Sequence, residues 1–251
     1  MHGPSLTLGF EMRVLVIIPT YNERENVLPI VMAVLAVTGP DIHVLVCDDN
    51  SPDQTAQWVE GLMKTESRLH LVVRREKQGL GPAYLAAFQW GLDRGYEVLV
   101  EMDADFSHRP EDLMKILERI STADFVMGSR WIPGGRTLNW GIGRQILSRV
   151  GTWYARTILG YPVADFTGGF NAWRRRVLES IDLPTVRSNG YSFQIELKYR
   201  ALKRGFKGVE VPILFEDRRA GHSKMSMRIV LEAVYRVWLL KLNGKAEKLK
   251  R

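Results

Sequence analysis

Short apolar runs alternate with helix-length segments through the first half of the chain, and this pattern limits the fold more than any other feature. The apolar runs, read as strands, cover residues 13–18, 42–47, 69–73, 97–102 and 125–127. The segments read as helices cover residues 27–37, 54–65, 83–94 and 110–120. Strands that alternate with helices of this length form βαβ units around a parallel sheet. The sequence therefore predicts an α/β protein whose mostly parallel sheet is flanked by helices.

Polar clusters follow three of these strands, namely Thr20–Glu23, Asp48–Asp53 and Asp103–His108. Ligands of parallel α/β sheets bind outside the carboxyl ends of the strands, so the clusters predict a ligand site at one edge. Asp103 and Asp105 stand one residue apart, and such a pair beside a loop suits Mg²⁺ or Mn²⁺ together with substrate phosphates. Taken alone, the pair slightly favours a solvated turn that caps the next helix, because Asp-x-Asp is short and common.

Composition and charge narrow the classes of partner. The 251 residues are 45% apolar and carry a formal net charge of +7, which favours an anionic partner such as an acidic substrate, a membrane surface or nucleic acid. The basic run Arg174–Arg176 has no RNA-binding motif beside it, so nucleic acid is not expected. No glycine-rich dinucleotide or P-loop motif follows a strand. The single cysteine, Cys47, excludes an intramolecular disulfide and fits a reducing compartment.

Two amphipathic helices are predicted in the second half. Residues 143–159 form one, with apolar side chains on one face and Arg144, Ser148, Arg149 and Arg156 on the other. Residues 227–242 form the second. Each helix could lie on a membrane surface with its basic residues facing anionic headgroups, or pack its apolar face on the protein. We expect a single domain over residues 13–242, an N-terminal extension over 1–12 without the features of a signal peptide, and a basic tail over 243–251.

Five motifs together resemble a known family. They are Ile18–Glu23 (IPTYNE), Cys47–Asp53 (CDDNSPD), Met102–His108 (MDADFSH), Gly128–Arg130 (GSR) and Gly221–Lys224 (GHSK). In this order and spacing they resemble the inverting family-2 glycosyltransferases of GT-A fold, and most narrowly the members that transfer mannose to polyprenyl or dolichyl phosphates. The resemblance covers the chain after residue 12. It implies GDP-mannose as donor, a polyprenyl monophosphate as acceptor, and Mg²⁺ or Mn²⁺ as cofactor.

The resemblance also implies roles for individual residues. Pro19, Tyr21 and Glu23 would line the guanine or ribose pocket, and Cys47 and Asp49 would contact the base and ribose. Asp103 and Asp105 would hold the metal, with the Ala104 backbone close to the donor. Ser107 departs from relatives that have Gln there, and would act only through a water. Arg130 would meet the donor sugar or diphosphate, Arg144 and Ser148 the lipid phosphate, and Arg218 and Lys224 the diphosphate. The residues closest to the chemistry would be Asp105, Arg130 and Arg144.

An acceptor phosphate is already an anion at neutral pH, so this reaction needs positioning and charge stabilisation rather than a strong base. Inversion would give a β-linked mannose. We expect an enzyme on the cytoplasmic face of a membrane, attached peripherally or through a small membrane-protein partner. One alternative is transfer of glucose or another sugar from a UDP-sugar. A second is transfer to a sugar hydroxyl with Asp165 as base, and a third is a non-catalytic binding module, against which the Asp103 and Asp105 pair argues.

Overall fold

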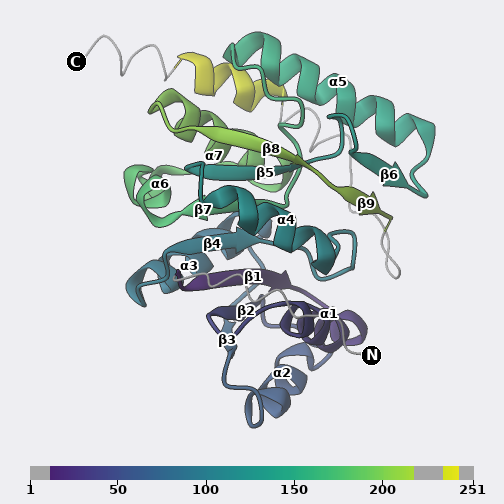
Figure 1. Cartoon of the computed structure of the whole chain (residues 1–251), viewed down its shortest axis with the longest axis vertical. Coiled ribbons are helices and arrows are strands. Elements are labelled where there is room, and N and C mark those ends of the chain that lie inside the picture. The colour runs from purple at the N-terminus through teal and green to yellow at the C-terminus, as the bar shows by residue number, and fades with distance from the viewer. Residues whose placement is uncertain (1–11, 218–233, 243–251) are drawn as a thin grey trace.

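The computed structural model describes residues 12–217 and 234–242, and Figure 1 shows a twisted sheet covered by helices. The sheet has seven strands in the order β3-β2-β1-β4-β7-β5-β8. These strands are β1 (Val14–Thr20), β2 (Ile42–Asp48), β3 (Leu69–Val73), β4 (Val98–Glu101), β5 (Phe125–Ser129), β7 (Asn171–Arg174) and β8 (Gly208–Pro212). A two-stranded sheet joins β6 (Arg136–Leu138) to β9 (Leu214–Glu216). The predicted α/β class with a mostly parallel sheet is confirmed.

Helices cover both faces of the large sheet. Their bounds are α1 (Arg24–Val37), α2 (Thr55–Met63), α3 (Leu80–Asp93), α4 (Pro110–Ile120), α5 (Ile142–Leu159), α6 (Arg175–Ser180), the 3₁₀ turn η1 (Leu183–Thr185) and α7 (Gly190–Lys203). One core lies under α1, α2 and α4, and the other lies under α3, α5, α6 and α7. The parallel strands β1, β2 and β4 are covered by helices on both faces of the sheet. Their sequences are continuously apolar for this reason.

The bounds of β3 and α4 agree with those predicted from the sequence. Helix α3 begins three residues earlier than predicted, at Leu80, because Pro82 fits the first turn of a helix. The residue before it, Gly79, has a φ of +101°, which only glycine adopts readily. The predicted loop over residues 132–140 contains β6, because its backbone pairs in parallel with β9.

Strand β7 runs antiparallel to both of its neighbours, β4 and β5. Its first residue therefore lies at the edge where the parallel strands end. The loop of residues 165–170, which leads into β7, is thereby brought to the same edge as the loops that follow β1, β2, β4 and β5. This reversal gathers an additional segment at the predicted ligand edge.

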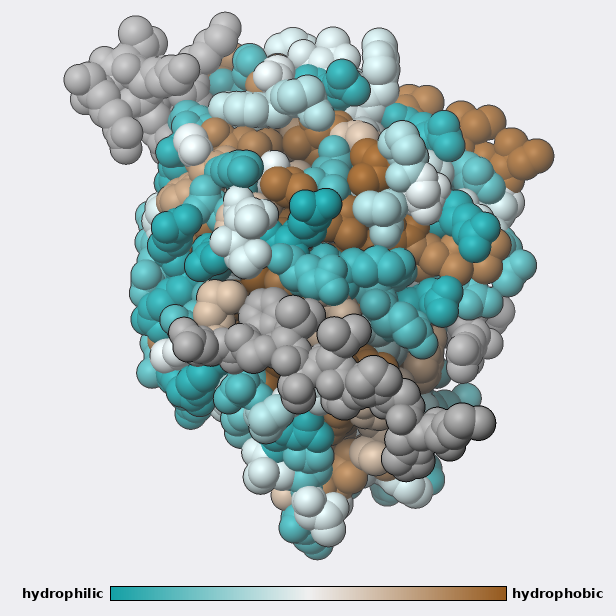
Figure 2. Space-filling view, in the orientation of Figure 1, coloured by the Kyte–Doolittle hydropathy of each residue, from teal (hydrophilic) through white to brown (hydrophobic). Residues whose placement is uncertain are grey.

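Helix α5 turns much of its predicted apolar face away from the protein. Ile142, Ile146, Val150 and Trp153 are between 52% and 76% exposed, whereas the buried residues of α5 are Thr152, Ala155 and Leu159. Figure 2 shows apolar residues gathered over this region, at the upper right of the view. Nowhere in residues 12–217 and 234–242 does a helix have the length and apolar character needed to cross a bilayer.

Several sequence predictions lie outside the described residues. They concern the extension over residues 1–11, the cations Arg218 and Lys224, the part of the last helix over residues 227–233, and the tail over 243–251. Residues 234–242 are helical, as predicted. The basic run Arg174–Arg176 is engaged within the fold. Arg174 donates to backbone carbonyls in the last residue of α4 and in the turn after it, Arg175 pairs with Glu179, and Arg176 pairs with Asp124.

Candidate active site

A cavity of about 460 Å³, here called the main cavity, opens at the carboxyl edge of the sheet. The residues at the ends of β1, β2, β4 and β5 contribute to its lining, and so does the loop before β7. Of the residues predicted to form the site, those that line it are Pro19, Tyr21, Glu23, Asp49, Asp103, Ala104, Asp105, Arg130 and Arg144. The structure therefore brings together residues as far apart in sequence as Pro19 and Arg144.

The paired acids Asp103 and Asp105 lie just beyond β4. The side chain of Asp103 is 36% exposed, and Asp105 is largely buried. Ser107 donates to Asp105 Oδ1 from both its hydroxyl and its backbone N–H. Ser107 thus orients Asp105 directly, and its action on a metal through a water stays a prediction.

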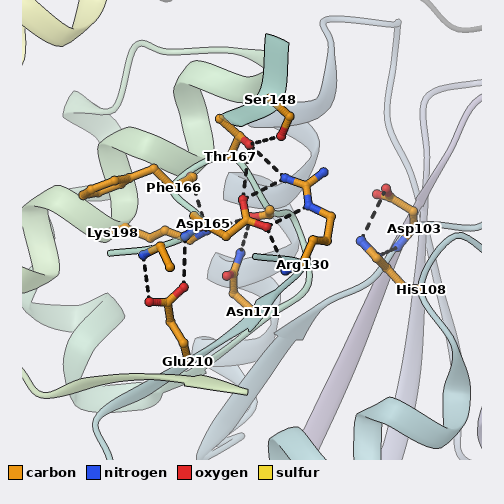
Figure 3. Close-up of polar contacts among 12 residues, drawn as sticks. Asp103, His108, Arg130, Ser148, Asp165, Phe166, Thr167, Asn171, Lys198 and Glu210 are labelled. Carbon is orange, nitrogen blue, oxygen red and sulfur yellow. Dashed lines mark hydrogen bonds and ion pairs between the residues drawn. The ribbon is translucent and has the colours of Figure 1, made fainter. Parts of the chain in front are cut away.

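His108 fixes the backbone of the same loop. Its Nδ1 accepts a hydrogen bond from the Asp103 N–H at 3.0 Å, and its Nε2 lies 3.9 Å from Asp103 Oδ2 (Figure 3). Burial lowers the pKa of His108 to about 4, so the ring is neutral at pH 7. With Nδ1 accepting, the proton of the neutral ring resides on Nε2 and faces the Asp103 carboxylate.

This donor set fits a hard divalent cation. Mg²⁺ and Mn²⁺ take one or two carboxylates and complete their shells with water and substrate phosphates. Asp103 and Asp105 both line the main cavity and supply such carboxylates. Across the described part of the chain, no group of three or more His, Cys, Asp or Glu side chains forms a complete protein shell.

The opposite side of the main cavity combines an aromatic ring with charged groups. Lys77 Nζ lies 3.8 Å from the centre of the Tyr21 ring, and Arg74 pairs with Asp49 at 2.6 Å. Burial raises the pKa of Asp49, although Arg74 opposes this effect. Cys47 does not line the cavity. It is fully buried beneath α3 and its thiol faces the Ala83 carbonyl at 3.5 Å, which differs from the expected contact with a base.

Two helix N-termini face the main cavity, those of α3 and α7. A single side chain, Asn189, joins them: its Oδ1 accepts from Gly81 N–H and Gly190 N–H, and its Nδ2 donates to the Gln78 carbonyl. A Cβ at Gly81 would lie 2.6 Å from the Ser188 carbonyl, so this close approach requires glycine. The N-terminus of a helix carries partial positive charge and favours bound phosphate.

Arg130 and Asp165 form a buried ion pair at the inner wall (Figure 3). Arg130 donates from Nε and Nη2 to the two Asp165 oxygens at 2.7 Å each, and also from its backbone N–H at 3.1 Å. Neither residue is more than 3% exposed. The pKa of Asp165 is lowered, because the Arg130 charge and hydrogen bonds outweigh the effect of burial. Both oxygens of this carboxylate accept hydrogen bonds from Arg130, and its lowered pKa makes it a weak proton acceptor. Asp165 is therefore unsuited to act as a general base.

The loop that carries Asp165 is held from beneath by a buried lysine. Lys198 on α7 is fully buried and donates to the carbonyls of Asp165, Phe166 and Gly168 at 2.8–3.2 Å. Glu210 on β8 accepts from the backbone N–H groups of residues 164 and 165 (Figure 3). Burial lowers the pKa of Lys198 to about 8. These contacts hold the loop and, through Asp165, the position of the Arg130 guanidinium.

A second cavity of about 210 Å³ adjoins the main cavity and is here called the apolar groove. It runs between α5 and the helix of residues 234–242, and Leu147, Val150, Trp153 and Val237 contribute apolar lining. Ser148 also lines it and hydrogen-bonds Thr167 at 3.2 Å. The residues shared by the groove and the main cavity are Arg130, Trp140, Arg144, Thr167 and Tyr191.

Arg144 stands at this junction. Its Nη1 donates to Asp217 at 2.7 Å, and the guanidinium lies 4.1 Å from the centre of the Trp140 ring. Its Nε is buried and has no hydrogen-bond partner among the described residues. A buried cationic donor with unused hydrogen-bonding capacity is a candidate contact for an anion at the junction.

Several residues of the main cavity were not anticipated from the sequence. They are Lys77, Trp140, Thr167, Asn189, Tyr191, Gln194 and Phe215. Asn189 had a detectable signal, because asparagine directly before a helix is a common N-cap. The others lie in segments whose local pattern indicates only a loop or helix, and reach the cavity through long-range packing.

The fold and the site together define a glycosyltransferase, and the chain belongs to glycosyl transferase family 2. The sequence model of that family matches residues 15–182. The chain is 48% identical over 238 residues to the polyprenol monophosphomannose synthase of Mycolicibacterium smegmatis, covering 94% of this chain and 89% of that protein. It is 49% identical over 226 residues to the undecaprenyl-phosphate mannosyltransferase of Micrococcus luteus, covering 90% and 93%. The family resemblance found in the sequence is thereby confirmed.

Solved structures share the fold. Glucosyl-3-phosphoglycerate synthase from Mycobacterium tuberculosis, crystallised with Mn²⁺, UDP and glucosyl-3-phosphoglycerate, matches with a TM-score of 0.66 and 18% identity over 97% of this chain and 86% of that one. Mannosyl-3-phosphoglycerate synthase from Rubrobacter xylanophilus matches with a TM-score of 0.67 and 18% identity over 96% and 76%. At this identity the likeness concerns the GT-A architecture alone.

Proposed function

We propose that the protein transfers mannose from GDP-mannose to a polyprenyl monophosphate with inversion, giving a β-linked polyprenyl-phosphate mannose. The observation that carries this proposal is the meeting of a cavity that is lined by several acidic and basic side chains with an apolar groove at Arg130 and Arg144. A nucleotide-sugar suits the first, an isoprenoid chain suits the second, and a phosphate suits the cations between them. The two mannosyltransferases that share about half of its residues support the choice of sugar and acceptor.

In this proposal the nucleotide occupies the side of the main cavity near Tyr21 and Asp49, and its diphosphate faces Asp103 and Asp105. A divalent cation, Mg²⁺ or Mn²⁺, would be held by these two carboxylates and would neutralise charge on the leaving GDP. The N-termini of α3 and α7 add positive potential to the same region. Arg218 and Lys224 remain proposed contacts of the diphosphate outside the described residues.

The reaction joins an oxygen of the acceptor phosphate to C1 of mannose as the bond from C1 to the GDP β-phosphate oxygen breaks. The attacking oxygen is already anionic, so no proton has to be removed. Arg144 and Ser148 are proposed to position that phosphate, while Asp165 keeps Arg130 in place without acting as a base. The rate enhancement then comes from alignment and charge stabilisation.

The acceptor is membrane-bound, and the exposed apolar side chains of α5 offer a surface that fits the boundary of a bilayer. Exposed Tyr235 and Trp238 on the helix of residues 234–242 extend this surface, because aromatic residues favour the membrane interface. We propose peripheral attachment at the cytoplasmic face. Flotation with liposomes tests it: recovery of the full chain only in the unbound fraction would indicate that a membrane-protein partner provides attachment instead.

Donor and acceptor are tested by product formation from radiolabelled sugars. GDP-mannose and UDP-glucose are each incubated with polyprenyl phosphate or with the uncharged polyprenol, with Mg²⁺, with Mn²⁺, or with chelator. We expect label in the lipid product only with GDP-mannose, the phosphate acceptor and a divalent cation. Lipid product formed with UDP-glucose and not with GDP-mannose would identify UDP-glucose as the donor. Product formed with uncharged polyprenol would contradict the base-free mechanism.

The apolar groove is tested by filling it. A Cβ at Gly151 on α5 first meets the Thr167 methyl at 3.9 Å, so Gly151→Leu places bulk in the groove without a backbone clash. We expect the variant to raise the KM for long-chain polyprenyl phosphate and leave the KM for GDP-mannose unchanged. Gly143→Leu on the same helix, where no atom lies within 4 Å of the added Cβ, is the control. Equal KM values in both variants would exclude the groove as the acceptor channel.

A further inference from the structure

A small cavity of about 120 Å³ lies between α7, residues 185–188 before it and the helix of residues 234–242. It is here called the basic cavity, and none of the described residues that line it also lines the main cavity or the apolar groove. The charged residues that line it are Arg187, Glu196, Arg200, Lys203, Arg204 and Arg236. The proposed reaction uses none of them.

The single acid of this group is already paired. Glu196 is almost fully buried, lies 2.5 Å from Arg200, and accepts a hydrogen bond from the Ser188 N–H at 3.2 Å. Arg200 is further fixed by its hydrogen bonds to the hydroxyl and carbonyl of Thr185 at 2.7 and 3.0 Å. Among the described residues that line this small concave site, five are cations and one is a carboxylate, so the formal charge of these side chains sums to +4.

A buried hydroxyl points to a ligand independently of charge. Ser188 is 2% exposed and lines the basic cavity, and its Oγ has no hydrogen-bond partner within the described residues. Buried polar groups in folded proteins are normally satisfied by protein, water or ligand. A hydroxyl donor beside guanidinium groups matches the several acceptor oxygens of a phosphate group.

The position of the cavity suggests the source of that phosphate. Arg236, Leu239 and Leu240 contribute lining from the helix of residues 234–242. On the same helix Tyr235 and Trp238 are 64% and 51% exposed. Aromatic residues at this exposure favour the membrane interface, and basic pockets beside a membrane bind anionic headgroups.

We propose that the basic cavity binds a phosphate group, supplied by the headgroup of an anionic phospholipid when the protein rests on a membrane. The site is separate from those for the sugar donor and the polyprenyl phosphate. It would fix the orientation of the helix of residues 234–242, and with it one wall of the apolar groove, on an anionic surface.

Three variants of the full chain test the site. Arg187→Gln/Lys203→Gln removes two charges from the cavity, and Ser188→Ala removes the hydroxyl without changing the charge. The control, Lys64→Gln/Arg119→Gln, removes two charges from exposed positions elsewhere, at the end of α2 and on α4 respectively. Binding of inorganic phosphate is measured by calorimetry. Binding to phosphatidylcholine vesicles with and without phosphatidylglycerol is measured by sedimentation, and urea unfolding verifies the fold of each variant.

For the lipid headgroup, we expect the phosphatidylglycerol-dependent affinity to fall about tenfold or more in the cavity double variant, to fall in Ser188→Ala, and to persist in the Lys64/Arg119 control. Loss of phosphate binding in the cavity variants with unaltered vesicle binding would assign the site to a soluble anion. Equal loss of vesicle binding in the two double variants, with no effect of Ser188→Ala on either probe, would overturn the proposal. Sugar transfer to a short-chain acceptor without vesicles should remain unchanged throughout, which separates this site from the proposed catalytic function.

Discussion

The Arg130–Asp165 pair offers the sharpest test of how the site is built. Asp165→Asn keeps the shape of the side chain but removes its charge, which leaves Arg130 buried without a counter-ion. Both side chains are at most 3% exposed and share two 2.7 Å hydrogen bonds. Removing one partner of a buried ion pair costs about 3–5 kcal/mol. We expect a loss of this size in the free energy of unfolding for Asp165→Asn, and a similar loss for Arg130→Met.

The double variant Asp165→Asn/Arg130→Met decides whether the two losses share one cause. If they do, the double variant is destabilised about as much as the worse single variant, and the cycle returns a coupling energy of about 3 kcal/mol or more. Urea unfolding followed by tryptophan fluorescence measures each free energy. Additive losses in the double variant would refute the description of a mutually dependent pair.

The same variants separate a structural from a catalytic role for Asp165. Loss of a general base lowers kcat by about 10²–10⁴-fold and changes the pH dependence of the rate. We expect Asp165→Asn, assayed at a temperature where it is folded, to raise the KM for polyprenyl phosphate and to keep the wild-type pH dependence of kcat. If kcat of the wild type rises with pH and kcat of Asp165→Asn does not, Asp165 acts as a general base and our description is wrong.

Three further predictions concern the metal, the membrane and pH. Asp103→Asn and Asp105→Asn should each lower kcat/KM by about 10²-fold or more and weaken Mn²⁺ binding, as measured by transfer assays and electron paramagnetic resonance; unchanged Mn²⁺ affinity in both would remove them as ligands. Trp153→Glu, at a position 65% exposed, should reduce liposome flotation about tenfold while the urea midpoint stays constant. Burial lowers the pKa of both His43 and His70 from 6.5, so below that pH the unfolded chain binds protons that the folded chain does not, and stability falls. His43→Gln/His70→Gln should reduce this loss in urea titrations between about pH 7 and pH 5, and an unaltered slope would contradict the shift.

The strands and the ligand edge were predictable because they depend on local pattern. Continuous apolar runs identify β1, β2 and β4, and the polar clusters that follow them must lie at one edge once the sheet is parallel. Asp103 and Asp105 could therefore be assigned to the site from the sequence. Cys47 differs because it lies one residue before the end of β2, where its side chain still packs beneath α3 rather than reaching the cavity.

Long-range pairing was not predictable by the same reasoning. Arg130 and Asp165 are 35 residues apart, and no local pattern indicates that they form a pair. Lys198 reads in sequence as one more cation of an ordinary helix, yet it is fully buried against the loop that holds Asp165. The orientation of α5 was left open because it packs through small and polar residues such as Thr152 and Ala155, which do not stand out as an apolar face.

The direction of β7 has a consequence for protein engineering. Because β7 runs against its neighbours, the segment of residues 160–170 crosses the active-site edge between two fixed ends, the last turn of α5 and the first residue of β7. Lys198 on α7 and Glu210 on β8 also hold this segment through its backbone. Exchanging it for the segment of a relative therefore requires these two residues to be exchanged with it, so the unit that can be transplanted consists of three separate stretches of the chain.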